Sequence, residues 1–96
     1  MIRHIVFIKF KPETTDEAII EIENGLRNLK GSIPEILDFE CGRDLIHSER
    51  SFDFALISAF DDLDALQRYQ VHPEHQAVVS KIKAAAESTK AVDYSF

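Results

Sequence analysis

Apolar and polar residues follow a two-residue pattern in four segments of the chain, as in β-strands whose side chains point to two faces. These segments are residues 2–10, 37–43, 52–60 and 90–96. Two other segments, 15–29 and 73–87, carry apolar residues at three- and four-residue spacing, which predicts amphipathic helices. A shorter helical pattern over 63–69 ends before Pro73, because proline interrupts helical hydrogen bonding.

Capping and turn residues mark the ends of these elements. Thr14 or Thr15 is expected to cap the first helix, and Gly31 is expected to end it. Asp61 or Asp62 is expected to cap the helix that precedes the proline. The elements therefore follow one another as strand, helix, strand, strand, helix and strand.

This βαββαβ order predicts an α+β, ferredoxin-like fold with a four-stranded antiparallel sheet. The chain has 96 residues, which is enough for one domain, so the predicted domain spans residues 1–96. A polar loop over 42–51 connects the two middle strands, and His47 in this loop is expected to be exposed to solvent.

The predicted helices can cover only one face of such a sheet. The other face carries a set of apolar side chains: Ile5, Phe7, Ala55, Ile57 and Ala59. An uncovered apolar patch of this kind is typical of an interface. We therefore expect a homodimer in which two sheets pack face to face about a two-fold axis, as a dimeric α/β barrel.

The formal net charge of −6 argues against nucleic-acid and anionic-membrane partners, which need clustered basic residues. No apolar stretch approaches the about 18 residues of a membrane span, and the N-terminal residues do not have the pattern of a signal peptide. A cytoplasmic location is expected. Cys41 is the single cysteine, which excludes an intrachain disulfide and predicts a buried, inert thiol.

Four stretches of the chain resemble the stress-responsive dimeric α/β-barrel family, abbreviated Dabb. They are HIVFIKFKP from His4, NGLRNLKGSIPEILDFECGRD from Asn24, SFDFALISAFDDLDAL from Ser51 and YQVHPEHQAVV from Tyr69. The HPEH tetrapeptide at residues 72–75 is the most specific of these features. The resemblance covers essentially the whole chain. It implies the same fold, a homodimer, and a small-molecule domain of a family in which many members have no assigned reaction.

Polyketide cyclases of the olivetolic acid type, which the resemblance includes, close an aromatic ring by intramolecular aldol condensation. The resemblance places their catalytic histidine at His75, their assisting tyrosine at Tyr69 and a first-strand histidine at His4. It thereby implies a cofactor-independent cyclase or lyase-like enzyme. His75 would be its general base, Tyr69 the partner of that base and His4 an orienting group.

The chemistry of these residue types is consistent with that implication. Pro73 suits the first position of the last helix, with His72 as its cap and His75 in its first turn. A helix N-terminus disfavours positive charge, so His75 is expected to be neutral, as a general base must be. The catalytic residues are expected to converge on a small-molecule pocket between sheet and helices. Its predicted substrate-binding residues are Phe52, Phe54, Leu56, Phe60 and His72.

Alternative interpretations of these histidines remain open. The His-Pro pair is also typical of a simple helix break, with imidazoles capping free backbone groups. His4, His72 and His75 offer three nitrogens to a metal such as Zn²⁺, but no carboxylate completes the set, and we predict neither a metal nor a cofactor. Two functions stay open: an enzyme acting on a small apolar carbonyl or phenolic compound, and a stress-protection dimer that binds a hydrophobic molecule without turnover.

Overall fold

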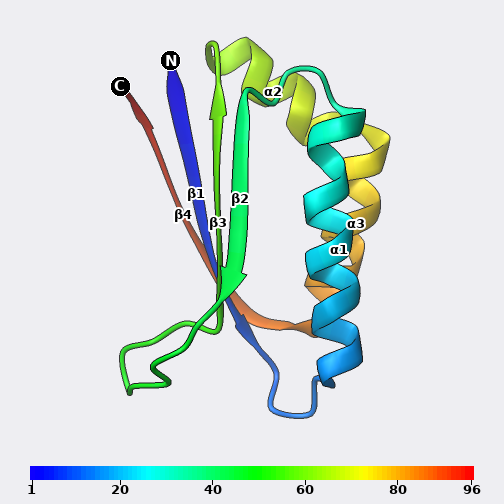
Figure 1. Cartoon of the computed structure of the whole chain (residues 1–96), viewed down its shortest axis with the longest axis vertical. Helices are drawn as coiled ribbons and strands as arrows, with labels where there is room; N and C mark the ends of the chain where they lie inside the picture. The colour runs from blue at the N-terminus through cyan, green and yellow to red at the C-terminus, as the bar shows by residue number, and fades with distance from the viewer.

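The computed structural model, which describes residues 1–96, contains a four-stranded antiparallel sheet with strand order β2-β3-β1-β4. Figure 1 shows all the helices on one side of this sheet. The elements are β1 (Ile2–Phe10), α1 (Asp16–Ser32), β2 (Asp38–Arg43), β3 (Phe54–Phe60), α2 (Leu63–Val71), α3 (Pro73–Ala85) and β4 (Ala86–Ser95). The predicted ferredoxin-like βαββαβ fold is confirmed, with its second helix divided at Pro73.

The hydrophobic core lies between the helices and one face of the sheet. It is formed by the apolar stripe of α1 and the inner residues of β1 and β3, among them Ile8, Ile22, Leu26, Leu29, Leu56 and Phe60. Thr15 is the cap of α1, because its hydroxyl accepts from the Ala18 N–H at 3.1 Å. Asp62 caps α2 in the same way, accepting from the Ala65 N–H at 2.8 Å. One member of each predicted pair is thus the cap.

The first helix continues through Gly31, so the predicted end at this glycine is wrong. α1 ends at Ser32, and the Ile33 N–H donates to the Leu29 carbonyl at 2.8 Å. Gly31 has no positive φ angle and does not form a left-handed cap. The side chain of Ile33 is fully buried, and the extra turn carries it into the core.

The last strand begins earlier than predicted. β4 starts at Ala86 instead of residue 90, and α3 therefore ends at Ala85 instead of residue 87. Residues 86–89 are alanine, glutamate, serine and threonine, which show no apolar strand pattern. Their extended conformation comes from pairing with the whole length of β1, from Ile2 opposite Ser95 to Phe10 opposite Ala86.

The third strand begins at Phe54, two residues later than predicted. Asp53 bonds to β1 through both its backbone and its side chain. Its N–H donates to the Ile8 carbonyl at 2.9 Å, and its carboxylate accepts from the Phe10 N–H at 2.8 Å. The side chain of Asp53 thus takes the place of a strand carbonyl. Phe52 lies against Phe7, with 6.0 Å between ring centroids.

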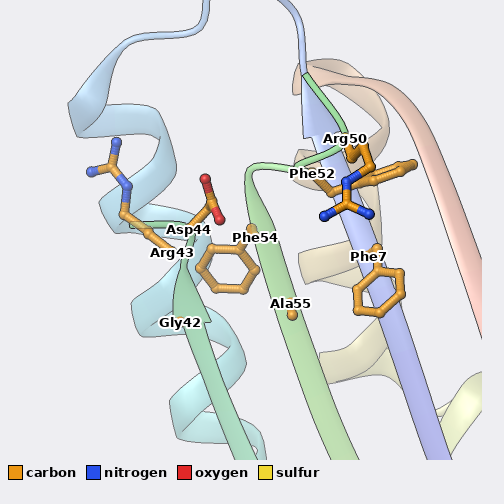
Figure 2. Close-up of a pocket in the computed structure, with 8 residues that line it drawn as sticks. All are labelled: Phe7, Gly42, Arg43, Asp44, Arg50, Phe52, Phe54 and Ala55. Carbon is orange, nitrogen blue, oxygen red and sulfur yellow. The ribbon is translucent and has the colours of Figure 1, made fainter. Parts of the chain in front are cut away.

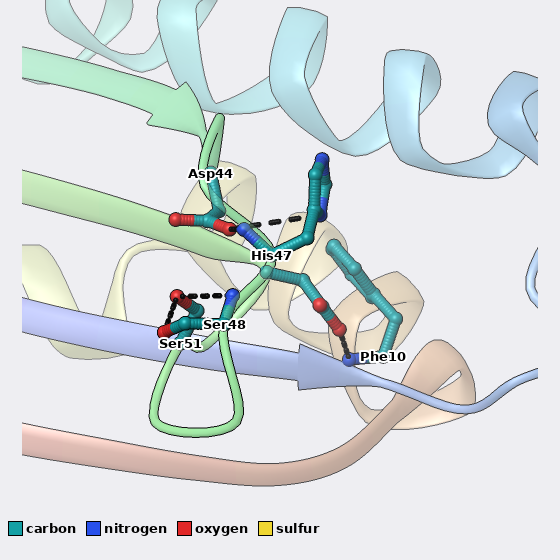
Figure 3. Close-up of polar contacts among 6 residues, drawn as sticks. Phe10, Asp44, His47, Ser48 and Ser51 are labelled. Atoms are coloured by element: carbon teal, nitrogen blue, oxygen red, sulfur yellow. Dashed lines mark hydrogen bonds and ion pairs between the residues drawn. The ribbon is translucent and has the colours of Figure 1, made fainter.

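The connection between β2 and β3 extends away from the helices in Figure 1. Short polar contacts within it, seen in Figure 3, fold this segment on itself. Asp44 accepts from the His47 N–H at 2.6 Å, and the Ser48 and Ser51 hydroxyls lie 2.8 Å apart. His47 is exposed, as predicted, and has a positive φ of 57°.

The strand register confirms which side chains share the outer face of the sheet. Ile5 pairs with Ile57, Phe7 with Ala55, and Arg3 with Ala59. The predicted apolar set therefore lies together, on the side that the helices leave open (Figure 1). No helix of the chain is both long and apolar enough to cross a membrane.

Candidate active site

The break between α2 and α3 is built around His72 and Pro73. The His72 N–H donates to the Tyr69 carbonyl at 3.1 Å, and its Nδ1 accepts from the Glu74 N–H at 3.2 Å. Pro73 takes a position at the start of α3, where its missing N–H costs no hydrogen bond. The predicted capping role of His72 is confirmed. This geometry places His75 one turn into α3, beside the end of α2.

His75 lies half-buried between the two helices, with its Nδ1 at 3.1 Å from the Gln70 carbonyl. A carbonyl oxygen only accepts hydrogen bonds, so Nδ1 carries the proton and Nε2 of the neutral ring carries the lone pair. Burial lowers the pKa of His75 below its usual range, the hydrogen bond to Gln70 opposes this, and nearby His4 and His72 lower it further. The ring is thus held as a neutral base with a defined tautomer.

Tyr69 packs directly against His75, with 4.2 Å between the two ring centroids. It also contacts Phe60 at 4.9 Å and His4 at 6.2 Å, and only 1% of its surface is exposed. Burial raises the pKa of the Tyr69 phenol well above its usual range, so the phenol stays protonated as a hydrogen-bond donor. The Tyr69 hydroxyl forms no hydrogen bond within the chain. Every fully buried polar side-chain atom does form one, so the hydroxyl oxygen must be partly accessible to solvent.

His4 completes the cluster from β1. It is 7% exposed, and its ring lies edge-on to those of Tyr69 and Phe60. Its Nδ1 bonds to a carboxylate oxygen of Asp93, which stands opposite it in the register of β4. The carboxylate accepts a hydrogen bond from the Nδ1–H of His4, so Nε2 is the ring nitrogen that this contact leaves free.

Asp93 is the site residue that the sequence analysis did not identify. No motif surrounds it, and only the pairing of β1 with β4 places it beside His4. The alternation of β4 contains a signal, because Asp93 falls on the side of the strand that faces the helices. The alternation identifies Asp93 as a neighbour of His4 only when the first residue of β4 and its register on β1 are known.

The predicted residues of the pocket wall do not all lie together. Phe60 belongs to the histidine cluster, and Leu56 lies in the adjacent core. Phe54 instead packs on Phe10 at 6.3 Å, at the opposite end of the strands from His4. Phe52 does not share the helix side of the sheet with Phe60, because the chain turns at Asp53 and Phe52 lies against Phe7 on the outer face (Figure 2).

The metal-binding alternative finds no geometric support in these residues. His72 accepts from the Glu74 N–H at Nδ1, so its ring carries the proton on Nε2 and has no free lone pair for a metal ion. No group of three His, Cys, Asp or Glu side chains is arranged to hold a metal ion. Cys41 is half-buried on β2, and burial raises the pKa of its thiol, as expected for an unreactive cysteine.

We expect His75 to titrate below the ordinary histidine value of about 6.5. Because the folded state lowers this pKa, protonation of His75 favours the unfolded chain. Its contribution to stability is therefore fully present above about pH 6.5 and falls as pH drops toward the lowered pKa. NMR titration of the imidazole resonances, assigned with a His75→Gln variant, measures the midpoint. A midpoint above 6.5 would contradict the burial argument.

Comparison with known proteins shows which family this chain belongs to. Residues 2–96 match the family described as Stress responsive A/B Barrel Domain. The chain is 37% identical over 82 residues to the uncharacterised protein SCO4036 of Streptomyces coelicolor, covering 83% of this chain and 84% of that protein. It is 25% identical over 96 residues to olivetolic acid cyclase of Cannabis sativa, covering 98% and 95%.

A solved structure has the same fold and is described as dimeric. It is a dimeric ferredoxin-like protein of unknown function from Thermobifida fusca, with a TM-score of 0.91 and 28% identity, covering 99% of this chain and 90% of that one. This similarity supports self-association of the present chain.

Proposed function

Because this chain belongs to the stress-responsive A/B barrel domain family, we propose that it is a cofactor-independent acid–base enzyme acting on a small apolar carbonyl or phenolic compound. The observation that carries the proposal is the hydrogen bond from His75 Nδ1 to the Gln70 carbonyl. It directs the proton to one side of the imidazole and leaves Nε2 as a base. Similarity to olivetolic acid cyclase supports cyclase or lyase-type chemistry.

In the proposed reaction, His75 Nε2 takes a proton from carbon next to a substrate carbonyl. The C–H electron pair moves into an enolate, whose oxygen receives a hydrogen bond from the Tyr69 hydroxyl. The enolate carbon then attacks a second carbonyl of the same molecule in an aldol step. The proton held by His75 returns to the new alkoxide, so that charge and atoms balance.

His4 acts here as the orienting group, and Asp93 fixes the orientation of its ring. With Nδ1 bonded to the carboxylate, Nε2 of His4 is the ring nitrogen left to bond a substrate hydroxyl. Phe60 and Leu56 supply apolar surface for the substrate, and His72 lies at the helix break beside it. Each role fits the environment of its residue: the buried Tyr69 phenol stays protonated, His75 has a lowered pKa, and His4 is held by Asp93.

The separation of the surface cavities from the histidines favours a second candidate, a module that binds a hydrophobic compound without turning it over. Tyr69 and His4 are almost wholly buried, and the surface cavities that line β2, β3 and the chain ends lie away from them. A pocket beside Tyr69 then depends on movement of neighbouring side chains. Ligand binding that persists in His75→Gln, with no turnover by the unaltered chain, would favour this candidate.

The proposal includes a cytoplasmic homodimer formed by one domain of residues 1–96. The outer sheet face, with Ile5, Phe7, Ala55, Ile57 and Ala59, is the proposed interface. The exposure of its large apolar residues supports this face: Ile5 and Ile57 are only partly covered, and Phe7 is 42% exposed. Dimeric structural relatives support self-association in general.

A Tyr69→Phe variant tests the enzyme proposal directly. Removing only the hydroxyl keeps the buried ring, so we expect folding to be retained while turnover falls by about 10²–10³, the usual cost of losing an oxyanion donor. The assay follows proton exchange next to the carbonyl, and ring closure, for linear poly-β-carbonyl and phenolic compounds. Tyr94→Phe makes the same change on the outer sheet face and is the matched control, with light scattering to verify that both variants keep the same oligomeric state. Equal rates for Tyr69→Phe and the unaltered chain would contradict the proposal.

A further inference from the structure

The break between α2 and α3 leaves one backbone carbonyl without its usual helical donor. In a continuous helix, the Gln70 carbonyl would accept from the N–H of the residue four positions later, which is Glu74. Here the Glu74 N–H donates to His72 Nδ1 instead, and the preceding residue, Pro73, has no N–H to offer. The Gln70 carbonyl must therefore find its donors among side chains or water.

Two side chains of α3 donate to this carbonyl. His75 Nδ1 lies 3.1 Å from the Gln70 oxygen, and Gln76 Nε2 lies 2.6 Å from the same oxygen. Because a carbonyl oxygen only accepts, the NH2 end of the Gln76 amide faces it. The oxygen has two lone pairs, so it accepts both hydrogen bonds at once. The proposed base and the residue that follows it thus share one acceptor.

The helix break explains how neighbouring residues reach the same atom. Side chains at consecutive positions of a helix point in different directions and do not normally meet. Only His72 separates the end of α2 from the start of α3, so the last carbonyls of α2 lie against the first turn of α3. The shared acceptor is therefore a consequence of this break.

We propose that Gln76 is a positioning residue for the base. Its amide holds the Gln70 oxygen in place and limits how strongly that oxygen binds the imidazole of His75. The inference rests on the proposed role of His75 in proton transfer. Gln76 acts through the shared carbonyl and needs no contact with a substrate.

Electrostatics gives the direction of this effect. The amide hydrogens of Gln76 carry partial positive charge and lie at the oxygen that also binds the imidazole. They repel a protonated His75 ring more strongly than a neutral one. The hydrogen bond to Gln70 raises the pKa of His75, and the competing amide is expected to reduce that rise. Gln76 thus favours the neutral ring, which is the form that accepts a proton.

Charged and titratable groups also surround His75 on every element that packs near it. They are Tyr69 on α2, His4 on β1 with Asp93 bonded to it from β4, His72 at the break and Glu74 at the start of α3. A substitution at Gln76 leaves all of these groups in the chain. A change in the titration of His75 in such a variant can therefore be assigned to the lost amide.

Replacing Gln76 with methionine tests the inference, because methionine has a similar length but no donor. We expect the titration midpoint of His75 to rise, as followed by NMR. Turnover near about pH 6 should then fall about threefold, the usual worth of one hydrogen bond, with the acid limb of the pH–rate profile moving upward. At about pH 8 the ring is neutral in both proteins, so rates should agree within about twofold.

The sign of the shift separates this effect from simple burial. An apolar methionine that only desolvated the ring would lower the pKa of His75 instead of raising it. Gln76→Lys restores a donor and adds positive charge, so it should return the midpoint to its original value or below. Gln67→Met makes the matched change at an exposed position of α2 and should leave the titration of His75 unchanged. Circular dichroism verifies that the variants keep their helices.

The midpoint needs no substrate, so the inference and the proposed function can fail separately. An unchanged or lowered midpoint in Gln76→Met would overturn the role of Gln76 while leaving His75 as the base. Equal loss of turnover at every pH, with no shift in midpoint, would also overturn it and indicate a structural role. A raised midpoint with an unmoved acid limb would overturn His75 as the base, and with it the role of Gln76 in the reaction.

Discussion

Replacing His75 with glutamine is expected to lower turnover by about 10²–10⁴, the usual contribution of general acid–base catalysis. Glutamine keeps a polar side chain of similar reach, and its amide can still donate to the Gln70 carbonyl. It has no titratable group that accepts the substrate proton. The loss is measured as the initial rate at saturating substrate, with whichever poly-β-carbonyl or phenolic compound the unaltered chain turns over.

The exposed loop provides the control for this prediction. His47→Gln makes the same chemical change on the β2–β3 connection, and we expect turnover to stay within about twofold, since surface changes of this kind rarely propagate. A comparable loss in both variants would indicate a general effect on the fold. Full activity in His75→Gln would exclude this residue as the base.

The largest effect on folding is expected for Phe60→Ala, at about 3–5 kcal/mol of unfolding free energy. Phe60 is fully buried at the end of β3 and packs on both Tyr69 and His4. Its truncation removes apolar contacts and leaves a cavity under the proposed site. Urea unfolding measures the loss at one fixed protein concentration, because the stability of a dimer depends on that concentration.

Two controls define this prediction. Leu63→Ala removes a side chain that is 65% exposed, and we expect a change within about 0.5 kcal/mol. Phe60→Leu keeps most of the buried volume and should cost less than about 1.5 kcal/mol. A loss below about 1 kcal/mol for Phe60→Ala would mean that the surrounding side chains close the cavity.

Together the two predictions distinguish the roles of neighbouring residues. Phe60 supports the aromatic cluster by packing, so its loss should lower stability and disturb activity together. His75 contributes one hydrogen bond to folding, a net effect of about 1 kcal/mol, and should act mainly on turnover. Measuring both quantities for both variants therefore tests the assignment of each residue.

Residue patterns alone predicted the order of the elements and the sides of β1. Alternation put His4, Ile8 and Phe10 on one face, and the structure buries all three. The helix break at Pro73 and the cap at His72 were also predictable, because both depend on chemistry within a few residues. The convergence of His4, Tyr69 and His75 was expected from family resemblance and is seen in the structure.

Tertiary structure decided the remaining features. Asp93 enters the site only through the register of β4 on β1, a contact between residues 89 positions apart. Phe52 changes face because Asp53 bonds across to β1, which no local pattern shows. Gly31 stays helical because the next turn brings Ile33 into the core.

The sequence by itself therefore determined the local structure and the identity of the chemical groups. Periodicity, caps and side-chain chemistry act over a few residues and can be read along the chain. Which groups meet depends on strand register and long-range burial, whose free energies override local propensity. For this protein, that level of structure supplies the carboxylate that bonds to His4 and the outer-face position of Phe52.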